Sequence, residues 1–189
     1  MPTLYRVFPY LSAAPDDAPG GALYAPGKAG GRIDNPELYS VLYLSDAAAG
    51  AIAEAFGRFP VWTAAMLQGS SSLPGSARAL ARYVLPDREP VCNLDDARRL
   101  LALRLRPSDV VTRDYNRSRA WASRIYKQGR WSGVRWWSYY EPRWASFGLW
   151  DTRRLGAAEV TLLQLDDPAL IEASRTITRP LVSSRTAQV

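Results

Sequence analysis

Near its start the chain alternates apolar and polar residues, which predicts a β-strand over residues 4–8. Leu4, Arg6 and Phe8 fall on one face of this strand, so an arginine lies among apolar neighbours. A stretch rich in Ala, Pro, Gly and Asp follows at about residues 11–31 and predicts a long loop. The chain therefore opens with a strand and a long connection.

A second strand and a helix are predicted directly after this loop. Residues 41–44 form a short apolar run typical of a strand, and residues 47–58 read as a helix that ends before Pro60. Ser45 and Asp46, between them, are residues that favour the N-cap of a helix. This part of the chain is therefore predicted as a strand that leads straight into a helix.

The rest of the chain switches between helical and strand-like patterns and contains no internal repeat. The predicted elements are a short helix near 76–83, a strand near 89–93, a helix over 95–102, a loop at 104–107, a helix over 115–128 that Gly129 ends, strands at 133–137 and 147–151, a strand at 160–165 and a helix at 168–176. Residues 183–189 are expected to be frayed. The order of elements predicts one domain over residues 1–189.

The composition supports one loop-rich α/β domain of the α+β type. A length of 189 residues fits one domain, and 47 % apolar residues are enough for a sizeable core. Fourteen prolines and thirteen glycines predict many turns, which disfavours a helical bundle. No apolar run reaches the roughly 18 residues that a membrane span requires.

Two features lead us to expect a cytoplasmic protein with no membrane association. The segment from Met1 to Arg6 lacks the charged-then-apolar order of a signal peptide. Cys92 is the only cysteine, so the chain cannot form an internal disulfide and gives no reason to posit an oxidising compartment.

The net charge is +6, and nearly all of the positive charge is arginine, since Lys28 and Lys127 are the only lysines. Arginine binds phosphate in a bidentate way, which suits a nucleotide or a nucleic acid as partner. Codon bias in a GC-rich genome would give the same excess of arginine. Both explanations stay open at this point.

Histidine is absent from the sequence. This excludes Ser-His-Asp and Cys-His catalysis, histidine-based metal sites and a histidine general base. A single cysteine also excludes a zinc ribbon and an iron–sulfur cluster. Any chemistry must therefore be performed by carboxylates, hydroxyls and arginines.

Glu54 is the first candidate for such chemistry. A helical wheel places Ile52 and Phe56 on an apolar stripe and Glu54 on another face. Gly50 at i−4 and Gly57 at i+3 share that face and leave open space around the carboxylate. Each glycine in a helix costs about 1 kcal/mol relative to alanine, and a closely approaching ligand would explain them. The alternative is a solvated glutamate beside two incidental glycines.

The segment Gly30-Gly31-Arg32, at the end of the long loop, is the second candidate. Two glycines let backbone amides approach an anion, and the following arginine can pair with a phosphate. The spacing is not that of a Walker loop or a Rossmann fingerprint. A Gly-Gly turn with a surface arginine is the commoner meaning of this pattern.

Residues 113–150 hold six of the seven tryptophans, interleaved with arginines. Such residues can stack on nucleobases, in RNA or in a dinucleotide. Trp121 and Ile125, at i and i+4, are spaced like core residues, so we interpret most of these tryptophans as packing. Ser138 follows the strand predicted at 133–137, where a hydroxyl can reach a ligand. An RNA-binding module stays open as an alternative to an enzyme.

Taken together, these segments resemble the RES domain, the toxin half of RES–Xre toxin–antitoxin pairs. No single motif is very specific, but their order and spacing are. The matching segments are Leu4-Tyr5-Arg6-Val7; Gly30-Gly31-Arg32 with Asp34-Asn35-Pro36; Leu42-Tyr43-Leu44-Ser45 with Glu54; Thr112-Arg113-Asp114-Tyr115 with Ala120-Trp121-Ala122; Gly133-Val134-Arg135-Trp136-Trp137-Ser138; and Phe147-Gly148-Leu149-Trp150-Asp151. They span residues 4–151, and the predicted strand and helix within 160–176 follow them.

The resemblance implies a fold like that of ADP-ribosyltransferases, a split mixed β-sheet with flanking helices that holds NAD+ in a cleft. It implies an enzyme that degrades NAD+ by phosphorolysis or hydrolysis, or one that transfers ADP-ribose to a protein. NAD+ is then a substrate, and no metal is needed. The implied partner is an Xre-family helix-turn-helix antitoxin, in a complex that can include a toxin homodimer, with no direct nucleic-acid binding by the toxin alone.

The resemblance also identifies the family's three named residues in this chain. Arg32 corresponds to the arginine and Glu54 to the glutamate. Ser138 fits the strand-end position of the serine. Some family members instead carry a serine before the later helix, where this chain has Asn116 and Ser118, and Asn116 can replace such a serine as a hydrogen-bonding group for the substrate.

The chemistry of NAD+ cleavage is compatible with a site without histidine. The bond between nicotinamide and ribose breaks through an oxocarbenium-like state, and nicotinamide departs neutral, so no general acid is needed. A carboxylate such as Glu54 stabilises the developing cation. Arg6 and Arg32 would hold the pyrophosphate, Tyr43 would pack on the nicotinamide and ribose, and Ser138 would bind the substrate or position the nucleophile.

Overall fold

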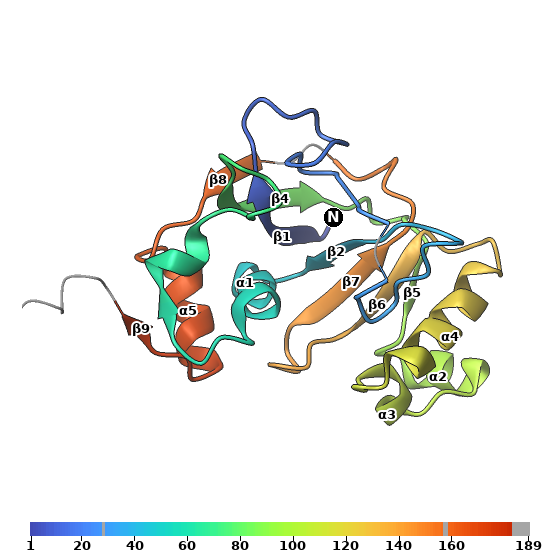
Figure 1. Cartoon of the computed structure of the whole chain (residues 1–189). Coiled ribbons are helices and arrows are strands. Elements are labelled where there is room, and N and C mark those ends of the chain that lie inside the picture. Colours follow the sequence, from blue (N-terminus) through green and yellow to red (C-terminus); the bar gives the residue numbers. More distant parts are fainter. Residues whose placement is uncertain (28, 157–158, 183–189) are drawn as a thin grey trace, which may run out of the picture.

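The computed structural model describes residues 1–27, 29–156 and 159–182. Its main feature is a large mixed β-sheet with helices packed against it (Figure 1). Figure 1 shows α1 and α5 side by side at one end of the sheet and α2, α3 and α4 gathered at the other end. The prediction of a mixed α/β fold with flanking helices is confirmed.

The large sheet has seven strands in the order β5-β6-β7-β2-β1-β4-β8, and β3 and β9 form a small second sheet. Neighbouring strands of the large sheet are antiparallel except for the parallel pair of β5 and β6. The strands of the described residues are β1 (Thr3–Tyr10), β2 (Leu42–Ser45), β3 (Trp62–Thr63), β4 (Ala77–Val84), β5 (Val91–Asn93), β6 (Gly133–Trp137), β7 (Ala145–Leu149), β8 (Glu159–Leu162) and β9 (Leu181–Val182).

Most helices fall where the apolar periodicity predicts them. In the described part of the chain they are α1 (Ala48–Phe56), the 3-10 helix η1 (Ala64–Leu67), α2 (Ala97–Leu103), α3 (Pro107–Val110), α4 (Tyr115–Tyr126) and α5 (Pro168–Thr176). Gly129 has a φ of 66° just after α4, a conformation that glycine adopts without strain, and the helix ends there as expected. No helix of the described residues is long and apolar enough to cross a membrane.

The two halves of the large sheet meet at a narrow joint between β1 and β2. β1 pairs with β4 from Thr3 to Tyr10, and β2 pairs with β7 over all four of its residues. Between β1 and β2, by contrast, the register has the single pair Tyr5–Ser45. Strands that pair at one position diverge on either side of it, so this joint leaves space between the two halves. The split of the mixed sheet lies at this joint between β1 and β2.

Three apolar clusters stabilise the two halves of the sheet. One lies under the long loop that follows β1 and includes Leu4, Phe8 and Tyr83. A second joins α1 and α5 to the sheet, and the third packs α2 and α4 around Trp121 and Ile125, which are both about 1 % exposed. The interpretation of the i, i+4 pair in α4 as core is therefore confirmed.

The helix predicted near 76–83 is wrong. These residues form the strand β4, in which Ala79, Ala81 and Tyr83 alternate with less buried positions and are fully buried. Alanine and arginine favour helices intrinsically, but an eight-residue ladder with β1 outweighs that preference. The loop predicted at 104–107 is also shorter than expected, because Pro107 begins the helix α3.

The boundaries of two other elements differ from the prediction. β7 covers Ala145–Leu149, whereas the strand was expected at 147–151. α1 begins at Ala48 without a side-chain cap. Asp46 does not cap this helix because its Oδ1 accepts a hydrogen bond from the Ala145 N–H at 2.7 Å, which ties the start of α1 to β7. The predicted frayed tail at 183–189 lies outside the described residues.

Gly50 and Gly57 of the α1 region make room for protein side chains. A Cβ at Gly50 would collide with Ser45 Oγ and press on Trp144. A Cβ at Gly57 would collide with the ring of Tyr140. The hypothesis that a ligand explains these glycines is therefore not needed, because close packing of α1 against the β6–β7 connection explains both.

Candidate active site

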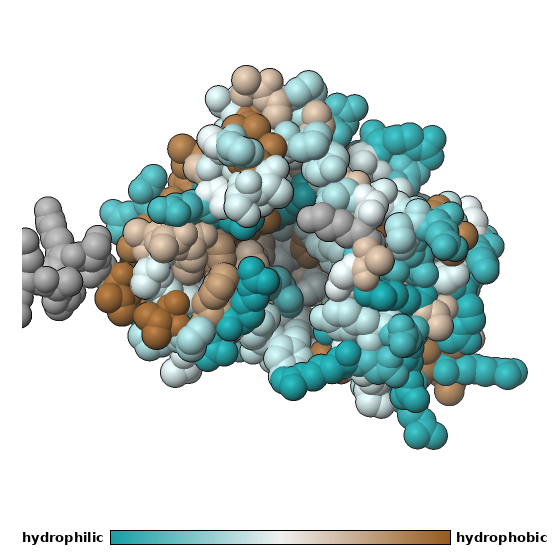
Figure 2. All heavy atoms as spheres, viewed as in Figure 1, coloured by the Kyte–Doolittle hydropathy of each residue, from teal (hydrophilic) through white to brown (hydrophobic). Residues whose placement is uncertain are grey.

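A cavity of about 440 Å³ opens at the joint between β1 and β2. This volume falls within the usual range of small-molecule sites. Figure 2 shows the hollow at the middle of the molecule, between the part that carries α1 and α5 and the part that carries α4. The polar and aromatic residues that line it include Tyr5, Arg6, Arg32, Asp34, Tyr43, Ser45, Glu54, Tyr115, Trp136, Tyr139 and Ser146.

The Glu54 carboxylate is held by two serines from the far half of the sheet. Its Oε1 accepts a hydrogen bond from Ser138 Oγ at 2.8 Å and a longer one from Ser146 Oγ at 3.5 Å. Ser138, directly after β6, is 2 % exposed, and Ser146 in β7 is 5 % exposed. Ser138 Oγ also accepts the Tyr140 N–H, so its single proton is directed at Glu54.

Glu54 reaches solvent through the cavity while protein surrounds it on its other sides. This environment raises the pKa of its carboxyl above the usual value of 4.5, because burial removes water from the charged form. The Ser138 hydrogen bond, the charge of Arg32 and the Ser146 hydrogen bond oppose that shift. The net result is a carboxylate with increased proton affinity next to an arginine.

Arg32 crosses from the long loop to the segment that precedes α4. Its Nη1 donates to the carbonyl oxygens of Val110, at 3.2 Å, and of Thr112. Its guanidinium lies over the Tyr115 ring, 5.4 Å from the centroid. Nε and Nη2 have no acceptor among the described residues, so this edge of the guanidinium remains available for a bidentate anion.

The turn that carries Arg32 is fixed by Asp34 and Tyr43. Asp34 accepts the Gly31 N–H at 2.5 Å and the Tyr43 hydroxyl at 2.6 Å, and Tyr43 in turn accepts the Ile33 N–H at 3.1 Å. Burial and the hydrogen bond to Asp34 raise the pKa of the Tyr43 hydroxyl. Tyr43 therefore stays a neutral donor, and its hydroxyl is engaged in holding the turn.

The first half of α4 supports the same turn from the other side. Ser118 Oγ donates to the Arg32 carbonyl oxygen at 2.5 Å. Arg119 donates to the carbonyl oxygens of Gly31 and Ala29 at 3.1 and 2.6 Å. The Arg32 turn is consequently bound both to β2, through Tyr43, and to α4.

Arg6 lies in β1 on the same face as Leu4 and Phe8, as predicted, and lines the cavity. Its Nη1 and Nη2 donate to the carbonyl oxygens of Ala22 and Tyr24 at 2.9 and 2.8 Å. These bonds attach the long loop to the sheet. Arg6 thus has a structural role in addition to the position at the cavity that the sequence suggested.

Of the predicted site residues, the structure brings five together. Arg6, Arg32, Tyr43 and Glu54 line the cavity, and Ser138 bonds directly to Glu54. Asn116 is separate from this group. It is exposed on the first turn of α4, outside the cavity lining, and its N–H bonds to Asp114.

Sequence reasoning missed several residues at the cavity. Asp34 belongs to the quoted motif, and its position three residues after Gly31 is the usual spacing for a side chain that closes a turn. Ser146 gives no comparable signal, because only the pairing of β7 with β2 and β6 brings it to Glu54. Tyr115 and Tyr139 line the mouth and are 38 % and 55 % exposed.

Besides Asp34, which holds the Arg32 turn, the arrangement combines the Glu54 carboxylate, the two serine hydroxyls bonded to it and two arginines at a partly apolar cavity. Such a set can stabilise a developing cation beside Glu54 while the arginines bind an anion on the same ligand. No group of three or more Cys, Asp or Glu residues suited to hold a metal ion occurs in the described parts of the chain. The residues therefore fit chemistry on a substrate that carries both a positive centre and a phosphate.

Comparisons with family models and with solved structures both find similar proteins. The model of the RES domain family matches residues 3–170. The fold is similar to that of the toxin in the crystal structure of the M. tuberculosis MbcT-MbcA toxin-antitoxin complex, with a TM-score of 0.61 and 16 % sequence identity over 93 % of this chain and 88 % of that chain. No curated protein sequence gives a significant match.

Proposed function

Because the chain belongs to the RES domain family, we propose that it is the toxin of a toxin–antitoxin pair and that it degrades NAD+. The reaction is cleavage of the bond between nicotinamide and ribose, with water or phosphate as acceptor. The family assignment and the fold shared with the toxin of the MbcT–MbcA complex support the toxin role.

The observation that carries the proposal is the Glu54 carboxylate, aimed into the cavity and fixed by Ser138 and Ser146. When the glycosidic C–N bond breaks, the electron pair leaves with the nicotinamide nitrogen, and positive charge develops on the ribose. A fixed carboxylate stabilises that charge more than it stabilises the ground state. Glu54 is suited to this role without a histidine or a metal.

Arg32 and Arg6 are the groups that would bind the pyrophosphate of NAD+. Arg32 presents its Nε and Nη2 edge, which has no acceptor among the described residues, and Arg6 lies across the joint in β1. A pyrophosphate between these two side chains would place the attached ribose toward Glu54. We include Tyr43 as a wall for the nicotinamide and ribose, and we leave Asn116 out because of its position on the exposed surface.

The proposed reaction balances with either acceptor. An oxygen of water or phosphate forms the new bond to the ribose carbon, its proton passes to solvent, and neutral nicotinamide leaves. In the cytoplasm, an Xre-family antitoxin would neutralise the toxin. The structural neighbour is part of a toxin–antitoxin complex, which supports an antitoxin partner for this chain as well.

The test is to incubate the purified protein with NAD+, with and without phosphate, and to measure free nicotinamide. Wild type should release nicotinamide, and Glu54→Gln should lower the rate at least about 100-fold. Glu172→Gln is the matched control, because Glu172 is exposed on α5 and away from the cavity. ADP-ribose-1″-phosphate formed only with phosphate identifies phosphorolysis.

Two results would contradict the proposal. If wild type releases no nicotinamide under either condition, the substrate is wrong, and if Glu54→Gln equals wild type, the site is wrong. ADP-ribose found on protein would identify a protein ADP-ribosyltransferase instead. Against the RNA-binding alternative, Trp121, Trp136 and Trp144 are buried and cannot stack on bases.

A further inference from the structure

A second groove lies on the helical end of the molecule, separate from the catalytic cavity. It runs between the C-terminal end of α2 and the second half of α4, and it shares no lining residue with the cavity. Its volume is about 240 Å³. The residues that line it are Ala102, Leu103, Arg104, Leu105, Trp121, Arg124, Ile125 and Gln128, so an apolar floor lies between two arginines.

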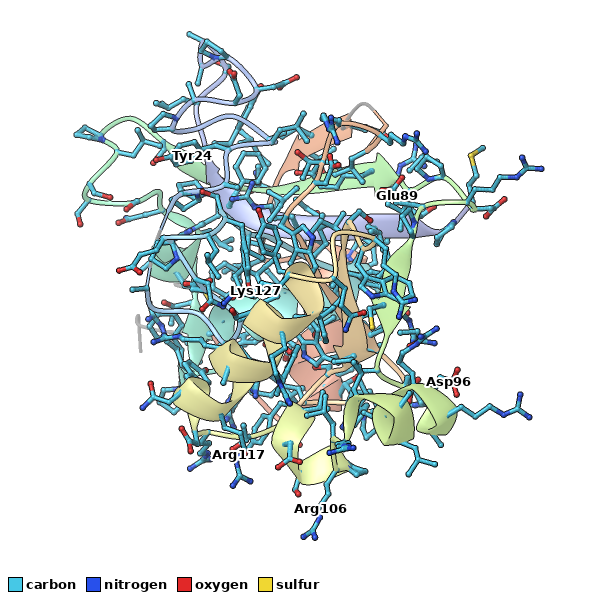
Figure 3. All side chains as sticks on the ribbon, turned by 90° about the vertical axis from the view of Figure 1, so that its right-hand side faces the viewer. Tyr24, Glu89, Asp96, Arg106, Arg117 and Lys127 are labelled. Carbon is cyan, nitrogen blue, oxygen red and sulfur yellow. The ribbon has the colours of Figure 1, made fainter. Side chains whose placement is uncertain are left out.

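This end of the molecule carries the excess positive charge of the chain. Residues 98–130 contain ten arginines and lysines but only two acidic residues, Asp109 and Asp114. Both acids are used within the fold, because Asp109 pairs with Arg117 at 2.7 Å and Asp114 caps α4. Figure 3 shows this face from the front, with Arg106 and Arg117 projecting outward beside α3 and α4.

The two arginines of the groove have no acidic partner among the described residues. Some other exposed arginines are paired with an acid, as in Arg82–Glu159, Arg143–Glu141 and Arg153–Asp151. Arg104 and Arg124 make no side-chain hydrogen bond and no ion pair with the described residues. Two guanidiniums beside an apolar floor without an acidic partner are complementary to an external acidic group.

Arg104 is also held in an unusual backbone conformation. It caps the C-terminus of α2 with φ 54° and ψ 44°, the left-handed region where glycine is preferred. A non-glycine side chain in that region is strained. Glycine would relieve the strain, so the presence of an arginine at this position points to a use for its side chain.

We propose that this groove is a docking site for an acidic peptide segment of a partner protein. An apolar side chain of the peptide enters the groove between Leu103, Leu105 and Ile125, and flanking carboxylates pair with Arg104 and Arg124. An apolar anchor in a pocket, surrounded by charge pairs at its rim, is the usual anatomy of peptide recognition. The site is independent of the NAD+ reaction.

A peptide fits this face better than a nucleic acid does. Phosphates would pair with the arginines but would leave the apolar side chains of the groove without a partner. The aromatic residue of the groove, Trp121, is 1 % exposed and cannot stack on a base. The combination of apolar floor and basic rim therefore favours an acidic, amphipathic peptide.

The experiment uses the full chain and a fluorescein-labelled peptide of roughly 16 residues, long enough to form a helix, built from Glu, Leu and Ala. Binding is followed by fluorescence anisotropy. The double variant Arg104→Glu/Arg124→Glu should weaken binding at least tenfold. Arg88→Glu/Arg154→Glu changes the net charge equally at two exposed arginines outside the groove, and it should stay within twofold of wild type.

A second variant leaves the charge unchanged and tests whether binding is lost for a reason other than misfolding of the double variant. Ala102→Phe fills the groove from an exposed position of α2 and should also weaken binding, as should replacement of the peptide's Leu residues by Ala. The proposal is overturned if wild type does not bind the peptide, if both double variants lose affinity equally, or if the Leu-free peptide binds as well. Displacement by a single-stranded RNA that binds more tightly through Arg104 and Arg124 would overturn it too.

Discussion

Ser138 and Glu54 are joined by a hydrogen bond of 2.8 Å, although 84 residues separate them in the chain. The bond connects the end of β6 to the last turn of α1, across the joint that divides the sheet. It fixes the orientation of the carboxylate before any substrate arrives. The residues that form the candidate site are thus positioned by the pairing of strands rather than by a contiguous motif.

We predict that the hydrogen bonds from Ser138 and Ser146 to Glu54 contribute unequally to the reaction rate. A hydrogen bond to a charged group contributes about 1.5–3 kcal/mol, which corresponds to a loss of about 10- to 150-fold in rate for Ser138→Ala. Ser146→Ala should lower the rate less than about fivefold, because the Ser146 hydrogen bond, at 3.5 Å, is longer and weaker. Nicotinamide release by the two variants measures the difference. Equal effects would contradict the assigned geometry.

The pH dependence of the reaction should report the raised pKa of Glu54. The carboxylate is the active form, so activity should fall on the acid side at a pH above the usual Glu value of 4.5. Ser138→Ala removes a bond that lowers this pKa and should move the acid limb to higher pH. A pH–rate profile of both proteins is the measurement, and an unshifted limb in the variant would argue against the bond.

Stability should change with pH in the opposite sense to activity. Because the folded state raises the Glu54 pKa, folding favours the protonated form, and stability is lost as pH rises from the unfolded value to the folded one. Glu54→Gln should therefore be more stable than wild type at neutral pH. The advantage should vanish below the usual Glu pKa. Thermal melts of both proteins across pH 4–8 test this, with Glu172→Gln as control.

Tyr43→Phe and Asp34→Asn should weaken substrate binding by loosening the Arg32 turn. Removal of the Tyr43 hydroxyl breaks its bonds to Asp34 and to the Ile33 N–H. We expect KM for NAD+ to rise more than kcat falls, since the pyrophosphate contact is affected first. Tyr10→Phe is the control, on β1 outside the cavity lining. A change in kcat alone would assign Tyr43 a different role.

Gly57→Ala should destabilise the fold by about 1–3 kcal/mol through overpacking against Tyr140. Gly27→Ala is the matched control, because a Cβ there meets only Ser40 Oγ at an ordinary 3.7 Å. Chemical denaturation provides the two free energies of unfolding. If Gly57→Ala is as stable as wild type, the close packing of α1 against the β6–β7 connection is not required.

Local patterns predicted the helices better than they predicted how strands combine. α4 and α5 follow from apolar periodicity and from a glycine or proline at their ends. β4 was missed because alanine and arginine have no strand preference, and only its pairing with β1 decides its structure. The same limit applies to the site. Glu54 and Arg32 can be found in the sequence, whereas the contact of Ser146 with Glu54 depends on the order of the sheet.

That strand order also determines when the protein can become active during its own synthesis. The middle of the sheet pairs β2 with β7, more than 100 residues later in the chain, and Ser138 and Ser146 follow Glu54 by 84 and 92 residues. Contacts of such long sequence separation form late in folding. A nascent chain that ends before residue 146 lacks both the strand that closes the cavity and one of the hydroxyls that hold the carboxylate. Such a nascent chain therefore cannot yet form the candidate site.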